Sequence, residues 1–265
     1  MVLLGIVSVQ VGAAIAKQLF AVTGPAGAVA LRLVFASVIM VAVWRPSVRV
    51  SRRELLVILG YGAALAFMNI CFYQAIARIP LGVTVTIEVL GPLTVALVGS
   101  RRWSHAVWAL LAAGGVVLLT DGGGSVDWVG VVFGLCAATG WGLYILAGAA
   151  LGKHTSGGSG LALGMAMAGL VALPFGVADG GTALLSTPAL LAGLGVALLS
   201  SVVPYSVELE ALRRIPPRVF GVLMSLEPAV ASLAGLVVLG ENLEPLQWVA
   251  VCCVVIASIG ATRTS

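Results

Sequence analysis

The sequence predicts an all-α membrane protein, in which ten transmembrane helices form two inverted five-helix repeats around a central cavity. Three observations lead to this fold class: a very apolar composition, ten apolar segments of membrane-spanning length, and an internal repeat. Of the 265 residues, 60% are apolar and only 9% are charged. A soluble domain carries roughly a quarter of charged residues. Most of this surface must therefore face a medium other than water, and we expect that medium to be a lipid bilayer.

The ten segments follow from the thickness of the membrane, because a hydrocarbon core of about 30 Å requires roughly 17 to 25 apolar residues per helix. Spans of that kind occupy residues of about 2–22, 27–43, 55–76, 80–99, 104–120, 128–149, 159–178, 188–210, 216–239 and 245–262. Turn-forming residues separate them, as in TGPAG (23–27) and DGGGSVD (121–127). Helices satisfy every backbone amide in lipid, and the segments are too long for barrel strands. The first span lacks a cleavage signal, so we expect a retained helix rather than a signal peptide.

Positive charge is concentrated in alternate connections. Counted from the N-terminus, the odd connections contain one cation, Arg78, whereas the even connections and the C-terminus contain eleven. These eleven are Arg45, Arg49, Arg52, Arg53, Arg101, Arg102, Lys153, Arg213, Arg214, Arg218 and Arg263. Cytoplasmic loops carry such an excess of Lys and Arg, so we expect both termini in the cytoplasm. The net charge of +4 therefore reflects membrane topology, and we expect no nucleic-acid partner.

An internal repeat divides the chain. AIARIPLGVTVTIEVLGPLTVAL (75–97) aligns without gaps to ALRRIPPRVFGVLMSLEPAVASL (211–233), and eight of 23 positions are identical. Five spans fall in each half, and an odd number forces the halves to cross the membrane in opposite directions. Many transporters have such inverted repeats and hold their sites near the midplane between them. We therefore predict two repeats, residues 1–121 and residues 128–263, and a transporter rather than a duplicated scaffold.

Two glutamates lie inside predicted spans. Glu88 comes eight residues after Pro80, near the middle of the bilayer. Glu227 aligns with Gly91, three residues from Glu88, and positions three apart share a helix face. A carboxyl at this depth faces water, pairs with a cation or carries a proton. Each glutamate is a candidate to bind a substrate ammonium or to load and release a proton, and the alternative is a structural carboxyl that ties helices together.

Two cations also lie inside spans. Lys17 is late in the first span, with Gln10 seven residues earlier on the same face, and Arg32 is early in the second span. Either cation is a candidate to hold a substrate carboxylate or to pair with a glutamate. Lys17 has a further alternative, in which its side chain extends to the lipid headgroups.

Polar and aromatic side chains in other spans are candidates to line a central pocket. Asn69 and Tyr73 are four residues apart in the third span, and Tyr205 in the eighth aligns with Asn69. The alternative for these three is hydrogen bonding between helices without a role in binding. Trp141 and Tyr144 in the sixth span are candidates for the pocket wall or for the packed core.

Five stretches resemble a known family. YQAIARIPLGVTVTIEVLGPLTVALVGSRR and VPYSVELEALRRIPPRVFGVLMSLEPAVASLAGLVVLGE are similar to the EamA-type drug/metabolite transporters, in particular to their threonine/homoserine exporter branch. VQVGAAIAKQLF, ALRLVFASVIM and GWGLYILAG fit the same branch. The resemblance implies a carrier of the bacterial inner (plasma) membrane that exports small neutral amino acids by antiport with protons. Export of an aromatic amino acid, a nucleoside or a cationic drug stays open as the alternative, and no oligomeric state is predicted.

Other function classes find little support. The sequence contains no phosphate-binding glycine loop, no metal-ligand spacing and no Ser–His–Asp arrangement at one depth. We therefore expect no enzyme, no cofactor and no metal site. The partners expected are a small-molecule substrate, protons and lipid. In the predicted cycle Glu88 or Glu227 takes the substrate's ammonium, Lys17 or Arg32 holds its carboxylate, and Asn69 or Tyr205 contacts its side chain.

Overall fold

The computed structural model describes residues 1–47, 50–98, 103–121, 127–154, 158–205, 207, 214 and 217–264. The first half contains α1 (Val2–Trp44), α2 (Arg52–Ile76), α3 (Leu81–Glu88), α4 (Leu90–Val98) and α5 (Trp103–Asp121). The second half contains α6 (Trp128–His154), α7 (Ser159–Gly180), η1 (Gly181–Leu185), α8 (Thr187–Ala197), the π-helical η2 (Leu198–Val202), α10 (Pro217–Met224), α11 (Glu227–Ala234), the π-helical η3 (Gly235–Leu239) and α12 (Pro245–Thr264). Of the cations that predict orientation, Arg49, Arg101, Arg102 and Arg213 lie outside the described residues.

The predicted all-helical membrane character is confirmed for the described part of the chain, which contains no strand. Seven helices there are long and apolar enough to cross a membrane. Two shorter apolar helices, Leu81–Ala96 and Val107–Leu118, accompany them. The count of ten spans in an inverted repeat stays a prediction.

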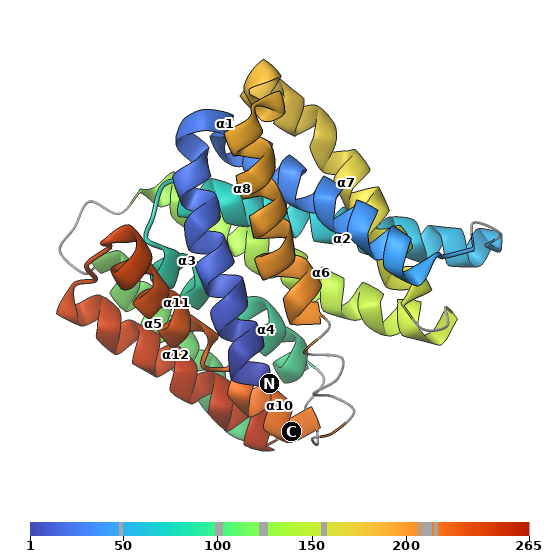
Figure 1. Cartoon of the computed structure of the whole chain (residues 1–265). Helices are drawn as coiled ribbons and strands as arrows, with labels where there is room; N and C mark the ends of the chain where they lie inside the picture. Colours follow the sequence, from blue (N-terminus) through green and yellow to red (C-terminus); the bar gives the residue numbers. More distant parts are fainter. Residues whose placement is uncertain are drawn as a thin grey trace.

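Helix α1 is broken where the sequence predicts a turn, at TGPAG. Gly24 has φ 68° and ψ 167°, a backbone conformation that favours glycine, and a side chain there would collide with the Asp179 carboxylate. The next segment begins with Pro25, and the Ala26 N–H donates to Asp179 Oδ2 at 2.9 Å. A carboxylate from α7 thus caps the new helix start. Figure 1 shows α1 turning sharply near the top of the molecule.

The fourth and ninth predicted spans are also interrupted, and proline explains both breaks. A proline cannot donate a hydrogen bond to the carbonyl four residues earlier. Helix α3 ends at Glu88, four residues before Pro92, and α10 ends at Met224, four residues before Pro228. The breaks place Glu88 at the last residue of α3 and Glu227 at the first residue of α11.

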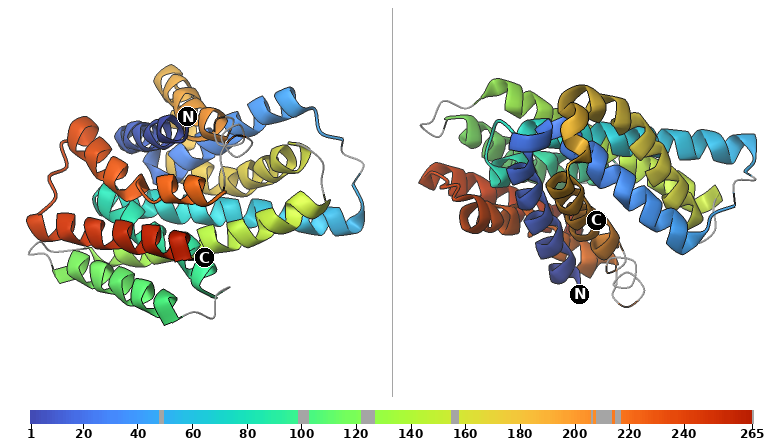
Figure 2. Two further views of the ribbon diagram at one scale, coloured as in Figure 1. Left: turned by 90° about the horizontal axis from the view of Figure 1, so that it is seen from below. Right: turned by 45° about the horizontal axis from the view of Figure 1, so that its top comes forward.

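The main packing joins helices from different halves of the chain. Helix α1 packs on α7 and α8, α2 on α6 and α7, α3 on α11, and α5 on α12. Figures 1 and 2 show α5 and α12 running together along one side of the bundle. The α3–α11 contact is close, because a Cβ atom on Gly82 would lie 2.7 Å from Ser232 Cα. The two halves are therefore interlocked, and the space between them is bounded by both.

Candidate functional site

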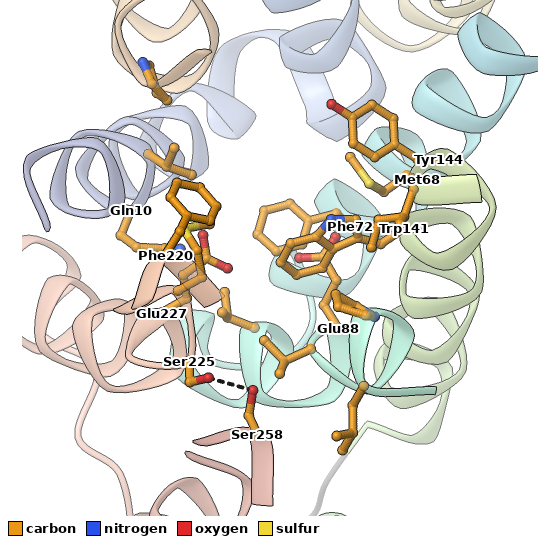
Figure 3. A pocket seen from close by; sticks show the side chains of 18 of the residues that line it. Gln10, Met68, Phe72, Glu88, Trp141, Tyr144, Phe220, Ser225, Glu227 and Ser258 are labelled. Carbon is orange, nitrogen blue, oxygen red and sulfur yellow. Dashed lines mark hydrogen bonds between the residues drawn. The ribbon is translucent and has the colours of Figure 1, made fainter. Parts of the chain in front are cut away.

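A cavity of about 400 Å³ lies between the halves of the chain. Its wall includes eight of the ten side chains that the sequence nominates. Five are polar or charged: Gln10, Arg32, Asn69, Glu88 and Glu227. Three are aromatic: Trp141, Tyr144 and Tyr205. In Figure 3, Gln10, Phe220 and Glu227 face Met68, Phe72, Trp141 and Tyr144 across the opening.

The cavity extends toward one end of the bundle. Along α3 and α4 it is lined from Val85 to Ala96, and along α12 it is lined near the C-terminal end by Ala261 and Thr262. The lining therefore reaches toward the end at which α4 and α12 finish.

Lys17 does not line the cavity and lies toward the opposite end, near the start of α3. Its Nζ lies 2.6 Å from Glu241 Oε1 and donates to the Ile79 carbonyl at 3.2 Å. The other oxygen of Glu241 accepts the Leu81 N–H at 2.8 Å, at the start of α3. Lys17 thus pairs with a glutamate, one of its three predicted roles, but this glutamate is neither Glu88 nor Glu227. The ion pair joins α1, the start of α3 and the segment before α12.

Arg32 is held in the cavity wall with part of its donor capacity unused. Its guanidinium donates to Ser201 Oγ at 3.3 Å, to the Tyr73 hydroxyl at 3.3 Å and to the Ser200 carbonyl at 3.0 Å. A guanidinium has five N–H donors in a rigid fork that matches a carboxylate. Among the described residues these three bonds leave two of the five N–H donors without a partner. Tyr73 is fully buried behind Arg32 and orients it, rather than lining the cavity itself.

Glu88 is the acid that faces this cation. It is 8% exposed, and its charge interacts with that of Arg32. Within the part of the chain that the structure describes, no hydrogen bond or ion pair occupies its carboxyl. A buried carboxylate without a partner is costly. Glu88 is therefore suited to bind a proton or a cationic group of a ligand.

Glu227 and Asn69 complete the polar wall. Glu227 is 6% exposed and begins α11 on the side opposite to Trp141. The Asn69 amide donates to the Leu65 carbonyl of its own helix at 2.8 Å, which fixes its orientation.

Several lining residues were not nominated from the sequence. Phe220 and Met224 precede Glu227 by seven and three residues, a helical spacing that points all three to one face. That spacing could have identified them. Ser225 and Ser258 share a hydrogen bond of 2.7 Å at the cavity wall (Figure 3). No sequence signal distinguishes these two serines from others that pack between helices.

This arrangement suits a small zwitterion. A carboxyl without a partner and a forked guanidinium face one cavity, beside aromatic and amide groups. Among the described residues no group of three or more His, Cys, Asp or Glu side chains is placed to hold a metal ion.

Comparison with known proteins identifies the family. Residues 128–263 match the EamA-like transporter family. The threonine/homoserine exporter RhtA of Escherichia coli K12 is 41% identical over 266 residues, and the match covers 99% of this chain and 90% of that protein. The chain belongs to the EamA-like transporter family. The threonine/homoserine exporter RhtA of Salmonella typhimurium LT2 is 40% identical with the same coverage.

Membership confirms two expectations from the sequence. The resemblance to EamA-type transporters is correct, and the protein is a transporter rather than an enzyme. The family and the long apolar helices together indicate a multi-pass inner-membrane protein. A solved crystal structure superposes with a TM-score of 0.68 at 16% identity, over 99% of this chain and 96% of that one, and so shares the fold.

Proposed function

We propose that this EamA-like transporter exports threonine, homoserine or a closely similar neutral amino acid in exchange for protons. The observation that carries the proposal is the presence of Arg32 and Glu88 in the wall of one cavity. An α-amino acid has one carboxylate and one ammonium, and these residues offer a complementary group to each. The names of the relatives at 40–41% identity supply the substrate class.

The cavity has a suitable size and access. Small-molecule pockets occupy roughly 300–1,000 Å³, and this one, at about 400 Å³, is near the lower limit. We infer that the end at which α4 and α12 finish is cytoplasmic, because the positive charges favour that side. Substrate would then enter from the cytoplasm while the Lys17–Glu241 ion pair closes the outer end.

We further propose ten crossings in two inverted repeats, residues 1–121 and 128–263. The pattern of packing supports this arrangement. Helix α2 packs on α6 and α7. Its counterpart in the repeat, α8, packs on α1. The two segments of α1, before and after its break, are the counterparts of α6 and α7. The α5–α12 contact joins two counterparts, and the α3–α11 contact joins the fourth predicted span to its counterpart, the ninth. Between whole spans, these main contacts are those expected from a two-fold exchange of the halves.

Proton coupling is proposed through the two glutamates. Glu88 binds the ammonium in the state that opens to the cytoplasm. After the halves rock, an external proton reaches Glu88 or Glu227 and displaces the ammonium. One carboxyl cannot bind the substrate ammonium and a proton at the same time. Binding and release of the substrate therefore alternate, and the proton gradient drives export.

Export of an aromatic amino acid is a second candidate. Phe72, Trp141 and Tyr144 lie on the same side of the cavity (Figure 3), where a ring would stack against them. Arg32 disfavours a purely cationic drug, because like charges repel inside a low-dielectric cavity.

The test uses purified protein in liposomes. Vesicles loaded with one labelled amino acid are diluted into media of defined pH, and efflux is measured with and without a protonophore. We expect threonine and homoserine to leave faster when the outside is acidic, and phenylalanine to be inactive. Faster efflux of phenylalanine would select the second candidate, and flux of all solutes without counterflow would indicate a pore and refute the carrier.

A further inference from the structure

Among the described residues, two buried polar atoms in the cavity wall lack a hydrogen-bond partner. They are Gln10 Oε1 and Ser200 Oγ, and both residues are 3% exposed. Folded proteins pair nearly all of their buried polar atoms, and each exception calls for an explanation. Trp108 Nε1, the third such atom among the described residues, packs near Gly260 between α5 and α12 and does not line the cavity.

Gln10 and Ser200 come from adjoining elements, α1 and η2. These elements are fixed to each other, because Ser8 Oγ donates to the Leu199 carbonyl at 2.7 Å. Ser200 Oγ lies against Gly12, where any side chain would collide with it. The π-helical turn of η2 is a feature often found at functional sites. Both residues line the same cavity.

The neighbouring groups indicate which chemical group of a substrate these two side chains can bind. The Ser200 carbonyl accepts from Arg32 at 3.0 Å, so the serine hydroxyl lies next to the proposed carboxylate position. Charged groups of a substrate are better matched by Arg32 and Glu88. A carboxamide and a hydroxyl each donate and accept neutral hydrogen bonds, and a substrate hydroxyl does the same.

We propose that Gln10 and Ser200 form the subsite that recognises the side-chain hydroxyl of the substrate. This inference rests on the proposed export of an amino acid and explains why a hydroxylated one is selected. The expectation that Asn69 contacts the substrate side chain stays a prediction beside it, because the bond to Leu65 uses only one of the two amide hydrogens of Asn69. Ser200 Oγ lies against Gly12. Staggered rotamers lie about 120° apart, so rotation about χ1 redirects a side chain of this kind.

A single analogue tests the subsite, since 2-aminobutyrate is both threonine and homoserine without the hydroxyl. Counterflow of labelled threonine and of labelled 2-aminobutyrate is measured in proteoliposomes over a range of concentrations. Gln10→Met keeps the length of the side chain, and Ser200→Ala removes one oxygen. We expect each variant to raise the half-saturating threonine concentration by about fivefold to tenfold and to leave that of 2-aminobutyrate nearly unchanged.

Two matched controls accompany the variants. Gln18→Met changes an exposed glutamine further along α1, which donates to the Val238 carbonyl at 3.2 Å. Ser37→Ala removes a hydroxyl that donates to the Val34 carbonyl at 2.7 Å and does not line the cavity. Both should keep the wild-type ratio of threonine to 2-aminobutyrate. Exchange of 2-aminobutyrate by the test variants shows that they are folded.

The outcomes separate the two proposals. If the wild type exchanges threonine but neither variant changes the ratio, the hydroxyl subsite is refuted and the exporter stands. A loss of both substrates from a variant that still unfolds like the wild type also refutes the subsite. If the wild type exchanges no amino acid at all, the proposed function fails and the subsite fails with it.

Discussion

Replacing Lys17 with methionine keeps an apolar stem of similar length and removes one half of the ion pair at the closed end of the bundle. The pair is short, at 2.6 Å, and the side chains are only 22% and 16% exposed. Exposed pairs contribute roughly 0.2–1 kcal/mol, whereas hydrogen bonds to charged groups contribute roughly 1.5–3 kcal/mol. Because this pair is mostly buried and Glu241 also accepts the Leu81 N–H, we expect a coupling of about 2 kcal/mol.

A double-mutant cycle measures that coupling. Wild type, Lys17→Met, Glu241→Gln and the double variant are unfolded in mixed micelles, and their free energies of unfolding are compared. Glutamine at 241 retains an oxygen for the Leu81 N–H, so the cycle isolates the charge pair. Arg53→Met, which changes an exposed cation at the start of α2, is the control and should stay within about 0.5 kcal/mol of the wild type.

A coupling below about 0.5 kcal/mol would place the pair among ordinary exposed ion pairs and refute the reasoning from its burial. A coupling near the expected value would mean that opening this end, as the proposed export cycle requires, breaks a substantial contact. In that proposed cycle, substrate or the proton would then have to offset the cost.

Three further predictions concern the site and the helix breaks. Glu88→Gln should abolish stimulation of threonine efflux by an acidic outside medium while the protein stays folded, and normal stimulation would remove Glu88 from the mechanism. Arg32→Lys should raise the half-saturating threonine concentration about tenfold, because lysine lacks the fork that matches a carboxylate; unchanged saturation would argue against that contact. Gly24→Ala should lower the free energy of unfolding by about 2 kcal/mol, since φ is positive and Asp179 occupies the space. Gly60→Ala, with no neighbour within 4 Å, is its control and should be neutral or stabilising.

The parts of the fold that the sequence predicts well are those fixed by the bilayer and by proline. Apolar length indicates helices wherever water cannot satisfy the backbone. TGPAG, Pro92 and Pro228 mark where those helices break, because the missing donor is a local property. The π-helical η2 and η3 carry no comparable signal, since they depend on contacts with distant helices.

The site is predicted in part for the same reason. A carboxyl or guanidinium inside an apolar segment must face the interior, so Glu88, Glu227 and Arg32 identify the cavity. Periodicity gives the face of a helix but not the partner that meets it. Lys17 therefore seemed a ligand for substrate, although Glu241, in a connection between helices, takes up its charge.

Tyr73 and Phe220 illustrate a second limit. Tyr73 is on the same face of α2 as the lining residue Asn69, but its hydroxyl accepts from Arg32 and its side chain is buried behind that residue. Only the packing of neighbouring helices separates these two positions. Phe220 lines the cavity. The sequence does not indicate this position, because an apolar side chain in a membrane protein can equally face lipid. Residues of this kind become visible only once neighbouring helices are placed.

The interlocked packing has a consequence for biosynthesis. Because α1, α2, α3 and α5 find their main neighbours in the second half, a ribosome must complete most of the chain before those faces can be covered. Until then the early helices lie in the membrane without these neighbours, and Arg32 and Glu88 are not yet enclosed by the second half of the chain. Membrane proteases and insertion chaperones would encounter the chain at that stage, so damage to the last helices should reduce the amount of protein in the cell before it reduces activity per molecule.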